Sequence, residues 1–184
     1  AGQAADKTIM MLATVATALP TFVTGPALAL FLGLWLGLLP VSGTGQGGAW
    51  LVMPVIALAL PVSGAIAKLT RAGLATVLNQ DHIRTARARG LSEIRILFKH
   101  GLRPALVPVA SYLGPAAAGL LTGAVVVETV FGLPGLGRYF VQGALNRDYP
   151  LVLGVVTLYA ALIILFNLFA DLIYGWLDPR MREG

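Results

Sequence analysis

The sequence predicts an all-α protein that crosses a membrane several times. Of its 184 residues, 57% are hydrophobic and only 11% are charged, whereas a soluble domain carries roughly 25% charged residues. A helix of about 20 apolar residues crosses the ~30 Å hydrocarbon core of a bilayer. Three uncharged intervals reach that length, and the first could hold two spans; they lie at 8–67, 104–127 and 149–170.

Four spans are expected, and proline and glycine mark where they break. The first would be ~48 Å long as one straight helix, so a kink or break is expected near Pro20, which removes a helical hydrogen bond. A Gly- and Ser-rich connector follows at 40–50. A Gly- and Pro-punctuated segment at 128–150 is expected to hold a short helix around residues 138–145. The predicted spans lie at 8–39, 51–78, 105–127 and 151–176.

Two pairs of glycines within these spans predict close helix packing. Gly33 and Gly37 form one pair, and Gly119 and Gly123 form the other. Small residues four positions apart let a second helix approach closely in a membrane. Gly37 has a second interpretation, as a tolerated glycine near the end of a helix.

The distribution of positive charge predicts which side of the membrane each connection faces. Eleven of the thirteen Lys and Arg fall on one side of the predicted spans, and only Arg138 and Arg147 fall on the other. Cytoplasmic segments carry an excess of Lys and Arg, so residues 79–104 and both ends of the chain are expected in the cytoplasm. Lys68 and Arg71 are expected to extend toward the lipid headgroups there. The same rule accounts for the net charge of +5, so no nucleic-acid partner is inferred.

Residues 79–104 form a basic island between two apolar spans. A short helix over 83–89 is expected to end at Gly90, because glycine is favoured just past a helix C-terminus. Ser92 is a candidate N-cap for a second short helix. The island holds six Lys and Arg, namely Arg84, Arg87, Arg89, Arg95, Lys99 and Arg103.

The second short helix of the island is predicted to be amphipathic. Ile94, Leu97 and Phe98 share one face by their i, i+3, i+4 spacing, while Arg95 and Lys99 share another. Such a segment could hold anionic lipid headgroups, serve as a solvated connector, or dock into a groove on a soluble partner. The glycine between the two helices favours docking, because a connector needs no defined bend.

Few residues outside the island could carry chemistry. Glu128 and Asp171 are the acids nearest membrane depth, where ionisable groups are candidates for function. Glu128 is expected to shape the outer mouth of a path or to form an interfacial hydrogen bond, and Asp171 to pair with a neighbouring helix or Arg180. His82 and His100 are too isolated for a metal site and are assigned to the docking surface. With no cysteine and no nucleophile, base and orienting group together, neither a metal site nor an enzyme is predicted.

The island resembles the cytoplasmic EAA motif of ABC importer permeases. In RTARARGLSEIRILFKHGLRPALVP the motif's triplet corresponds to Arg84, Thr85 and Ala86, and its glycine to Gly90. Arg and Thr stand where the general motif has Glu and Ala, and its proline comes one residue late, at Pro104. The match to the dipeptide, oligopeptide and nickel branch of the family is closer. Further segments resemble that branch in the same order: LPVSG at 39–43, LNQDHIRTARARG at 78–90, GAVVVETVFGLPGLG at 123–137, NRDYP at 146–150 and LDPR at 177–180.

This resemblance implies the transmembrane domain of a type I ABC importer in a bacterial cytoplasmic membrane. Such permeases normally have six spans, so this chain would be the C-terminal part with four of them. A second permease subunit would complete the path, two cytoplasmic ATPases would bind ATP and Mg²⁺, and an extracytoplasmic binding protein would deliver substrate. Short peptides are the commonest cargo of the branch, which also carries nickel complexes and glutathione-like compounds.

In such a complex this chain would bind no cofactor, since it has no GxxxxGK[ST] nucleotide-binding motif. The two short island helices would be coupling helices seated in a groove of an ATPase, and a bulky residue at the glycine bend is expected to uncouple transport. The residues implied at the ATPase contact are Arg84, Thr85, Ala86, Arg87, Gly90, Leu97 and Phe98.

The alternative from another class is an ion- or proton-coupled secondary transporter or a channel subunit. Such a protein would need ionisable residues at mid-membrane or broken helices around a site, and the long uncharged intervals argue against it. Association with an ATPase would distinguish an ATP-driven importer from a secondary transporter or a channel.

Overall fold

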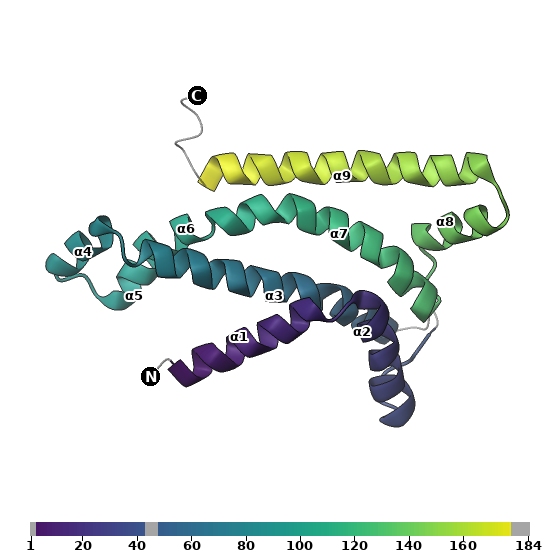
Figure 1. Ribbon diagram of the computed structural model, residues 1–184, viewed down its shortest axis with the longest axis horizontal. Helices are drawn as coiled ribbons and strands as arrows, with labels where there is room; N and C mark the ends of the chain where they lie inside the picture. Colours follow the sequence, from purple (N-terminus) through teal and green to yellow (C-terminus); the bar gives the residue numbers. More distant parts are fainter. Residues whose placement is uncertain (1–2, 43–47, 178–184) are drawn as a thin grey trace.

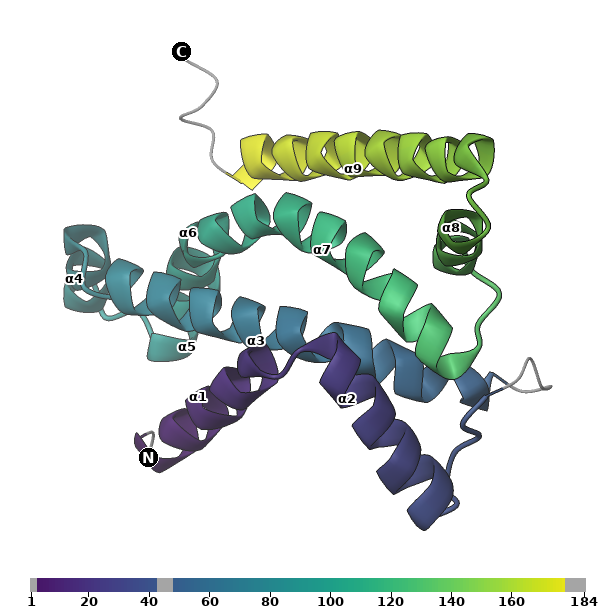
Figure 2. The same cartoon turned by 45° about the vertical axis from the view of Figure 1, so that its right-hand side comes forward.

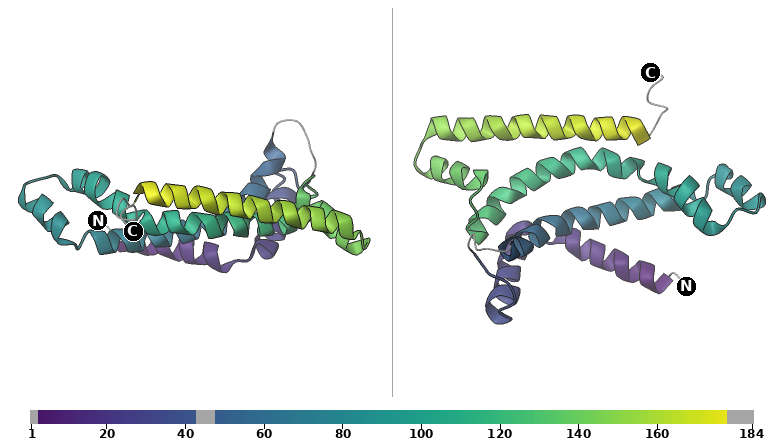
Figure 3. Two further views of the ribbon diagram at one scale, coloured as in Figure 1. Left: turned by 90° about the horizontal axis from the view of Figure 1, so that it is seen from above. Right: turned by 180° about the vertical axis from the view of Figure 1, so that it is seen from behind.

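The computed structural model describes residues 3–42 and 48–177, and this part of the chain is almost wholly helical. Four long helices lie side by side in the order α1, α3, α7 and α9, each packed against the next (Figure 1). Seen from above, the molecule is long and narrow (Figure 3). These helices are α1 (Gln3–Ala18), α3 (Val52–Val77), α7 (Val107–Phe131) and α9 (Tyr149–Leu177).

Three of the helical stretches are long and apolar enough to cross a membrane: residues 49–77, 107–131 and 149–175. The first predicted span is instead two helical pieces, α1 and a second piece over residues 21–35, bent by 102°. Counting this bent pair as one span gives up to four. The break expected near Pro20 is therefore confirmed, and it is sharper than a kink.

The bend at Pro20 sends the second helical piece away from the layer of long helices. Pro20 has an extended backbone conformation, with φ −65° and ψ 147°, and precedes α2 (Thr21–Leu28). A π-helical segment, η1 (Ala29–Trp35), continues α2. Figure 2 shows this piece projecting from the middle of α3, with α1 on the other side of the bend.

Short helices gather at both ends of the long ones. At one end lie the N-terminal turn of α1, the last turns of α9 and the helices of the basic island (Figure 1). At the other end lie η2 (Ala49–Leu51), which leads into α3, and α8 (Leu136–Leu145), the short helix expected around residues 138–145. The helices of the island are α4 (Asp81–Ala88), α5 (Glu93–Arg95), the π-helical η3 (Ile96–Gly101) and α6 (Leu102–Ala105).

Buried side chains form two small cores, one near each end of the long helices. The core near α8 joins η1, α3 and α7 and consists of Ala29, Met53, Ala57, Val127 and Phe131. The core of the island consists of Val77, Ile83, Ala86, Ile96 and Ala105. Between the cores many large apolar side chains stay exposed, as suits surfaces that face lipid or other helices.

Glycines permit the closest approaches between the long helices. A Cβ on Gly64 of α3 would lie 2.6 Å from the carbonyl oxygen of Ala13 in α1. Gly73 of α3 lies directly against the backbone of Ala105 in α6. In the same way, Gly114 of α7 lies against a side chain of α9, that of Asn167. The helices therefore pack closely at small residues, as is typical of membrane proteins.

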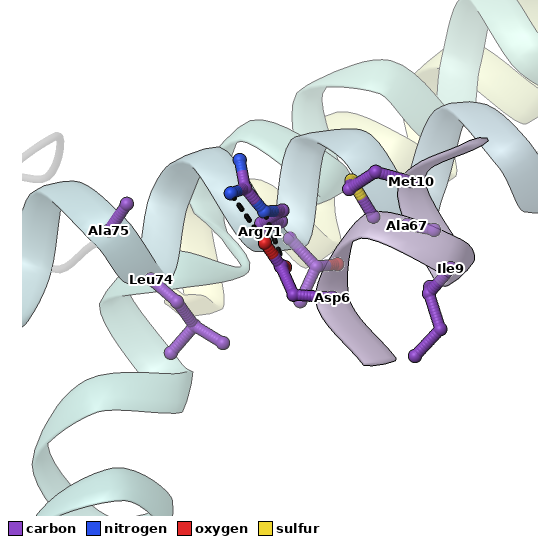
Figure 4. Close-up of a pocket in the computed structure, with 8 residues that line it drawn as sticks. Asp6, Ile9, Met10, Ala67, Arg71, Leu74 and Ala75 are labelled. Carbon is purple, nitrogen blue, oxygen red and sulfur yellow. Dashed lines mark hydrogen bonds and ion pairs between the residues drawn. The ribbon is translucent and has the colours of Figure 1, made fainter. Parts of the chain in front are cut away.

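An ion pair joins the first turn of α1 to α3, near the end of α3 that leads into the basic island. The Arg71 guanidinium donates hydrogen bonds of 2.6 and 2.7 Å to the two carboxylate oxygens of Asp6 (Figure 4). Both groups border a cavity of about 520 Å³, which is also lined by Ile9, Met10, Ala67, Thr70, Leu74 and Ala75. Arg71 thus binds α1, whereas the sequence predicted that it extends to the headgroups.

Lys68 of α3 also bonds to α1. Its ammonium donates a 2.6 Å hydrogen bond to the hydroxyl of Thr17, near the C-terminal end of α1. Thr17 also lies against Gly64, about one turn before Lys68 in α3. The Lys68 side chain therefore runs along the α1–α3 contact, and its extension to the headgroups stays a prediction.

Candidate functional site

The basic island folds as two helical arms joined at Gly90. The first arm is α4; the second is the continuous helical run of α5, η3 and α6. Gly90 has a left-handed backbone with φ of +75°, and the arms turn back on each other there, beyond the end of α3 (Figure 1). The prediction of two short helices joined at a glycine is confirmed, although the second arm is longer than expected.

Two backbone hydrogen bonds close the end of α4. The N–H of Gly90 donates to the carbonyl of Arg87 at 2.9 Å, and the N–H of Leu91 donates to the carbonyl of Ala86 at 3.3 Å. This pair of bonds is the Schellman motif, which uses a residue in the left-handed conformation just past the helix. The shape of the bend is therefore fixed by the backbone of Gly90. Ser92 stands at the N-cap position of α5, but its side chain makes no capping hydrogen bond.

A small core holds the two arms against the end of α3. Ile83 and Ala86 of α4 are buried, and they pack with Ile96 of the second arm and with Val77 and Ala105. Ala86 was predicted to contact an ATPase, but with 6% of its surface exposed it belongs to this core. The reason is that α4 is amphipathic and turns the face bearing Ile83 and Ala86 inward.

The outer surface of the second arm is apolar at its centre and basic around it. Ile94 and Phe98 are 72% and 64% exposed, and exposed apolar side chains rimmed by polar residues mark candidate interaction sites. Leu97, predicted to share their face, is half-buried. Ile96 is fully buried: it is two residues from both Ile94 and Phe98 and so lies on the opposite side of the helix.

The polar residues predicted at the ATPase contact differ in what they bind. The hydroxyl of Thr85 donates to the backbone carbonyl of Asp81 at 3.0 Å. Arg84 is exposed and lies 3.4 Å from the Asp81 carboxylate. Arg87 instead bridges the bend: its guanidinium donates hydrogen bonds of 2.7 and 3.1 Å to the two carboxylate oxygens of Glu93. Arg87 therefore joins the two arms across Gly90.

The ion pair across the bend depends on pH. The hydrogen bond from Arg87 holds the pKa of the Glu93 carboxyl below its usual value, and the same bond raises the pKa of Arg87. A lowered carboxyl pKa means that the pair stabilises the bend above the ordinary pKa of glutamate. This stabilisation is lost as the pH falls through the lowered pKa. Both groups are exposed, so solvent screens the interaction.

Glu128 fastens α8 to the end of α7. It lies in the last turn of α7, which runs to Phe131 rather than to the predicted 127. Its carboxylate accepts a 2.7 Å hydrogen bond from the N–H of Gly137 in the first turn of α8, where a helix favours negative charge. The carboxylate contacts Gly135 and Gly137 where their side chains would be. This geometry fits the predicted interfacial hydrogen bond; a function at the outer mouth of a path stays a prediction.

Only one glycine of the first pair approaches another helix of this chain: Met53 Cε of α3 lies 3.6 Å from the Cβ position of Gly33. Gly37 lies past the end of η1, with φ of +61°, and a Cβ added to it would have nothing within 4 Å. Gly33 lies against the side chain of Val41 in the loop that follows. Because the helix ends at Trp35, the two glycines do not share a helical face, and the alternative interpretation of Gly37 as a helix-end glycine holds.

The second pair is divided between two environments. Gly123 of α7 packs against α3, where Leu58 Cδ2 lies 3.4 Å from its Cβ position. Gly119, one turn earlier, faces open space. Its predicted contact with another helix stays a prediction.

The remaining polar candidates do not assemble into a chemical site. Within residues 3–42 and 48–177, no three His, Cys, Asp or Glu side chains are placed to hold a metal ion. His82 is exposed on α4 and His100 is half-buried on the second arm. Asp171 is exposed on α9, and its predicted partner Arg180 lies outside the described residues.

The fold and the site define a class: an α-helical, multi-pass membrane protein that carries a glycine-bent, basic helix pair at one end of its spans. The chain belongs to the family described as the binding-protein-dependent transport system inner membrane component, whose model matches residues 1–183. The resemblance seen in the sequence and the predicted fold class are both confirmed.

Individual relatives are permease proteins of peptide transport systems. The chain is 46% identical over 178 residues to the oligopeptide transport system permease protein OppB of Haemophilus influenzae. It is 47% identical over 179 residues to OppB of Salmonella typhimurium, and 41% identical over 177 residues to the dipeptide transport system permease protein DppB of Bacillus subtilis. These matches cover 96% of this chain but only 57–58% of each relative.

Proposed function

We propose that this chain is a permease subunit of an ATP-driven importer of short peptides. It forms half of a translocation path with a second, homologous permease, and residues 79–104 couple that path to two cytoplasmic ATPases. The observation that carries the proposal is the rigid bend at Gly90, which presents exposed Ile94 and Phe98 among cations. The names of the relatives support peptides as the cargo.

In this mechanism the bent helix pair is the docking element. Ile94 and Phe98 enter a groove on the ATPase, and Arg84, Thr85 and the cations of the second arm line the rim. Helix-in-groove binding of this kind depends on a few apolar anchors. Ala86 acts from inside the island by holding α4 against the second arm, and Leu97 does so in part.

Coupling then follows from a two-state equilibrium. ATP and Mg²⁺ bind the partner ATPases and bring them together, and the docked island moves with them. The core between the island and the end of α3 transmits this motion to the membrane helices, because a packed contact moves as a rigid body. The path thereby changes from inward- to outward-facing, where the extracytoplasmic binding protein releases its peptide. The chain itself hydrolyses no ATP and binds no metal or cofactor.

The proposed location is the bacterial cytoplasmic membrane, with residues 79–104 and the C-terminus in the cytoplasm. The excess of Lys and Arg in the island supports this orientation. So does the fold, which gathers the N-terminal turn of α1, the island and the last turns of α9 at one end (Figure 3). Arg138 and Arg147 lie on α8 and the turn after it, at the opposite end.

The proposal is tested by reconstitution in lipid vesicles. The permease is assembled with its second permease, its ATPases and its binding protein, and a labelled tripeptide is supplied outside. We expect ATP-dependent accumulation that requires the binding protein. Uptake driven by an ion gradient without ATP, in a permease that retains no ATPase on purification, would instead support the secondary transporter.

Exchanging Arg87 and Glu93 tests how the bend is held. Each single charge reversal, Arg87→Glu or Glu93→Arg, is expected to lower ATP-driven uptake roughly two- to fivefold, the scale of an exposed ion pair. The double exchange restores the attraction and should recover most of the uptake. If Arg87 contacts the ATPase directly, the double variant will stay as impaired as Arg87→Glu.

A further inference from the structure

The two cations at the α8 end of the molecule occupy positions that the local backbone does not favour. Arg138 lies in the first turn of α8 (Leu136–Leu145), where the helix dipole disfavours a positive charge. Arg147 follows α8 with φ of +59°, and among the described residues it is the one non-glycine residue with a positive φ. Glycine adopts this left-handed conformation more readily than a residue with a Cβ. Backbone preference therefore explains an arginine at neither position.

Main-chain hydrogen bonds fix the turn in which Arg147 lies. Its N–H donates to the carbonyl of Ala144 at 3.3 Å, and the N–H of Asp148 donates to the carbonyl of Gly143 at 2.8 Å, which is again the Schellman motif. The carboxylate of Asp148 accepts a 3.1 Å hydrogen bond from the N–H of Leu151 and so caps the start of α9. The turn thus uses the backbone of Arg147, and the neighbouring acid is bound to α9.

Both arginines are exposed and unpaired. Within residues 3–42 and 48–177, neither Arg138 nor Arg147 makes a hydrogen bond or an ion pair through its side chain. The ion pairs of this part of the chain join Arg71 to Asp6 or lie in the basic island. A guanidinium has five N–H donors in a planar fork that matches a carboxylate. Two such groups are therefore available to an acidic partner.

Large apolar and aromatic side chains surround these cations. Leu145 is 78% exposed, Tyr149 70% and Tyr139 54%. Leu145 shares one face of α8 with Arg138 and Gln142 by its i, i+4, i+7 spacing, while the buried glycines of α8 lie on the side that packs against α7 and α9. Arginine and tyrosine are enriched at protein–protein interfaces. The outer face of α8 therefore has the composition of a surface that binds another protein.

A lipid surface is the other candidate for cations and tyrosines, and the position of α8 argues against it. The α8 end lies opposite the basic island (Figure 1), so in the proposed orientation it is extracytoplasmic. The negative surface potential of the membrane belongs to the cytoplasmic leaflet, and electrostatic attraction to lipid is weak on the other side. Of the soluble partners in the proposed complex, the binding protein is the one on that side.

We propose that Arg138 and Arg147 bind carboxylates on the surface of the extracytoplasmic binding protein, with Tyr139, Leu145 and Tyr149 as the apolar contacts between them. This inference rests on the proposed function and deepens it, because it names the surface of this chain on which the binding protein docks. Charges at such a surface steer association and make binding depend on salt. The left-handed turn then serves to present the Arg147 side chain outside α8.

The test measures how tightly the binding protein, loaded with a tripeptide, binds the permease–ATPase complex in nanodiscs of neutral phosphatidylcholine. Arg147→Gly removes the charge and suits the left-handed backbone, so the turn is expected to persist. Combined with Arg138→Gln, it should raise the Kd roughly three- to tenfold at low salt, the scale of two exposed ion pairs. The Kd should also depend less on salt. Lys7→Gln removes an exposed cation of α1 and is the matched control, with no expected change in Kd.

Two further measurements separate docking from folding. ATP hydrolysis without the binding protein and retention of monodisperse complex after heating should match the wild type. Peptide uptake by the double variant should fall at low concentrations of binding protein and recover at saturating ones. A Kd equal to that of the wild type would overturn the proposal. So would weaker binding that comes with a loss of monodisperse complex, since the arginines would then act in the fold.

The lipid alternative has its own outcome. If the double variant retains less phosphatidylglycerol on purification from a mixed bilayer while its Kd for the binding protein is unchanged, the arginines bind headgroups and the proposal is wrong. A wild-type complex that the binding protein does not bind at any salt concentration would instead contradict the proposed importer. The two failures are therefore distinguishable.

Discussion

Replacing Gly90 with valine is expected to abolish ATP-driven transport while the permease still inserts into the membrane. Gly90 has φ of +75°, a conformation that costs an L-residue about 1–2 kcal/mol and a β-branched residue more. At 1.4 kcal/mol for each factor of ten, a cost of about 2 kcal/mol lowers the population of the native bend roughly 30-fold. Without the bend, the second arm, which carries Ile94 and Phe98, no longer packs against α4, so the proposed docking surface loses its orientation.

The cause of this loss can be isolated, because no atom lies within 4 Å of a Cβ on Gly90. Any effect of valine must come from the backbone and not from a steric clash. Gly90→Asn is the matched control, since asparagine tolerates the left-handed conformation, and it should retain a large part of the uptake. Peptide uptake, ATP hydrolysis and the amount of permease in the membrane are measured for both. Normal peptide uptake by Gly90→Val would show that the bend does not couple ATP hydrolysis to transport.

Replacing Gly64 with leucine is expected to cause the largest loss of stability. A Cβ at this position would lie 2.6 Å from the carbonyl oxygen of Ala13 and 3.2 Å from the Cβ of Ala16. Backbone atoms cannot turn aside as a side-chain end can, so α1 must move away from α3. Overpacking of this kind costs typically 1–3 kcal/mol, and displacement of α1 would also strain the Arg71–Asp6 and Lys68–Thr17 contacts.

Gly154 provides the comparison for this variant. It also lies within a long helix, α9, but it is exposed and has nothing within 4 Å of its Cβ position. Gly154→Leu should be neutral or slightly stabilising, because leucine favours the helix over glycine by roughly 0.8 kcal/mol. Retention of monodisperse complex after heating in detergent measures both variants. If Gly64→Leu and Gly154→Leu lose half of their monodisperse complex at similar temperatures, the α1–α3 contact is not as tight as the structure indicates.

Much of the architecture could be predicted because it follows from local rules. Uninterrupted apolar runs can only be helices in a bilayer, where every backbone group must be bonded within its own segment. Proline and glycine then fixed the breaks, so the bend at Pro20 and the turn at Gly90 were both foreseen. The resemblance in the island and in GAVVVETVFGLPGLG correctly identified the family.

The errors arose where local spacing was used to infer long-range contacts. The resemblance to the EAA motif implied that Ala86 contacts an ATPase, but the island packs against the end of α3 and takes Ala86 into its core. Helical spacing placed Leu97 on the docking surface, where it is half-buried. The four-residue spacing of Gly33 and Gly37 does not put them on one helical face, because the helix ends between them. Gly64 and Gly73, which do bring helices together, stand in no paired glycine motif and gave no signal.

The sequence by itself determined that this is a helical membrane protein with a basic, glycine-bent segment between two spans. Hydrophobicity, charge and backbone preference act residue by residue, so they can be read without the fold. Only the tertiary structure decided what each polar side chain binds: Arg87 to Glu93 across the bend, Glu128 to the start of α8, Arg71 to Asp6 and Lys68 to Thr17. The physical reason is that a long side chain chooses its partner by what the packing of other helices brings within hydrogen-bond distance, and that packing joins residues far apart in the chain.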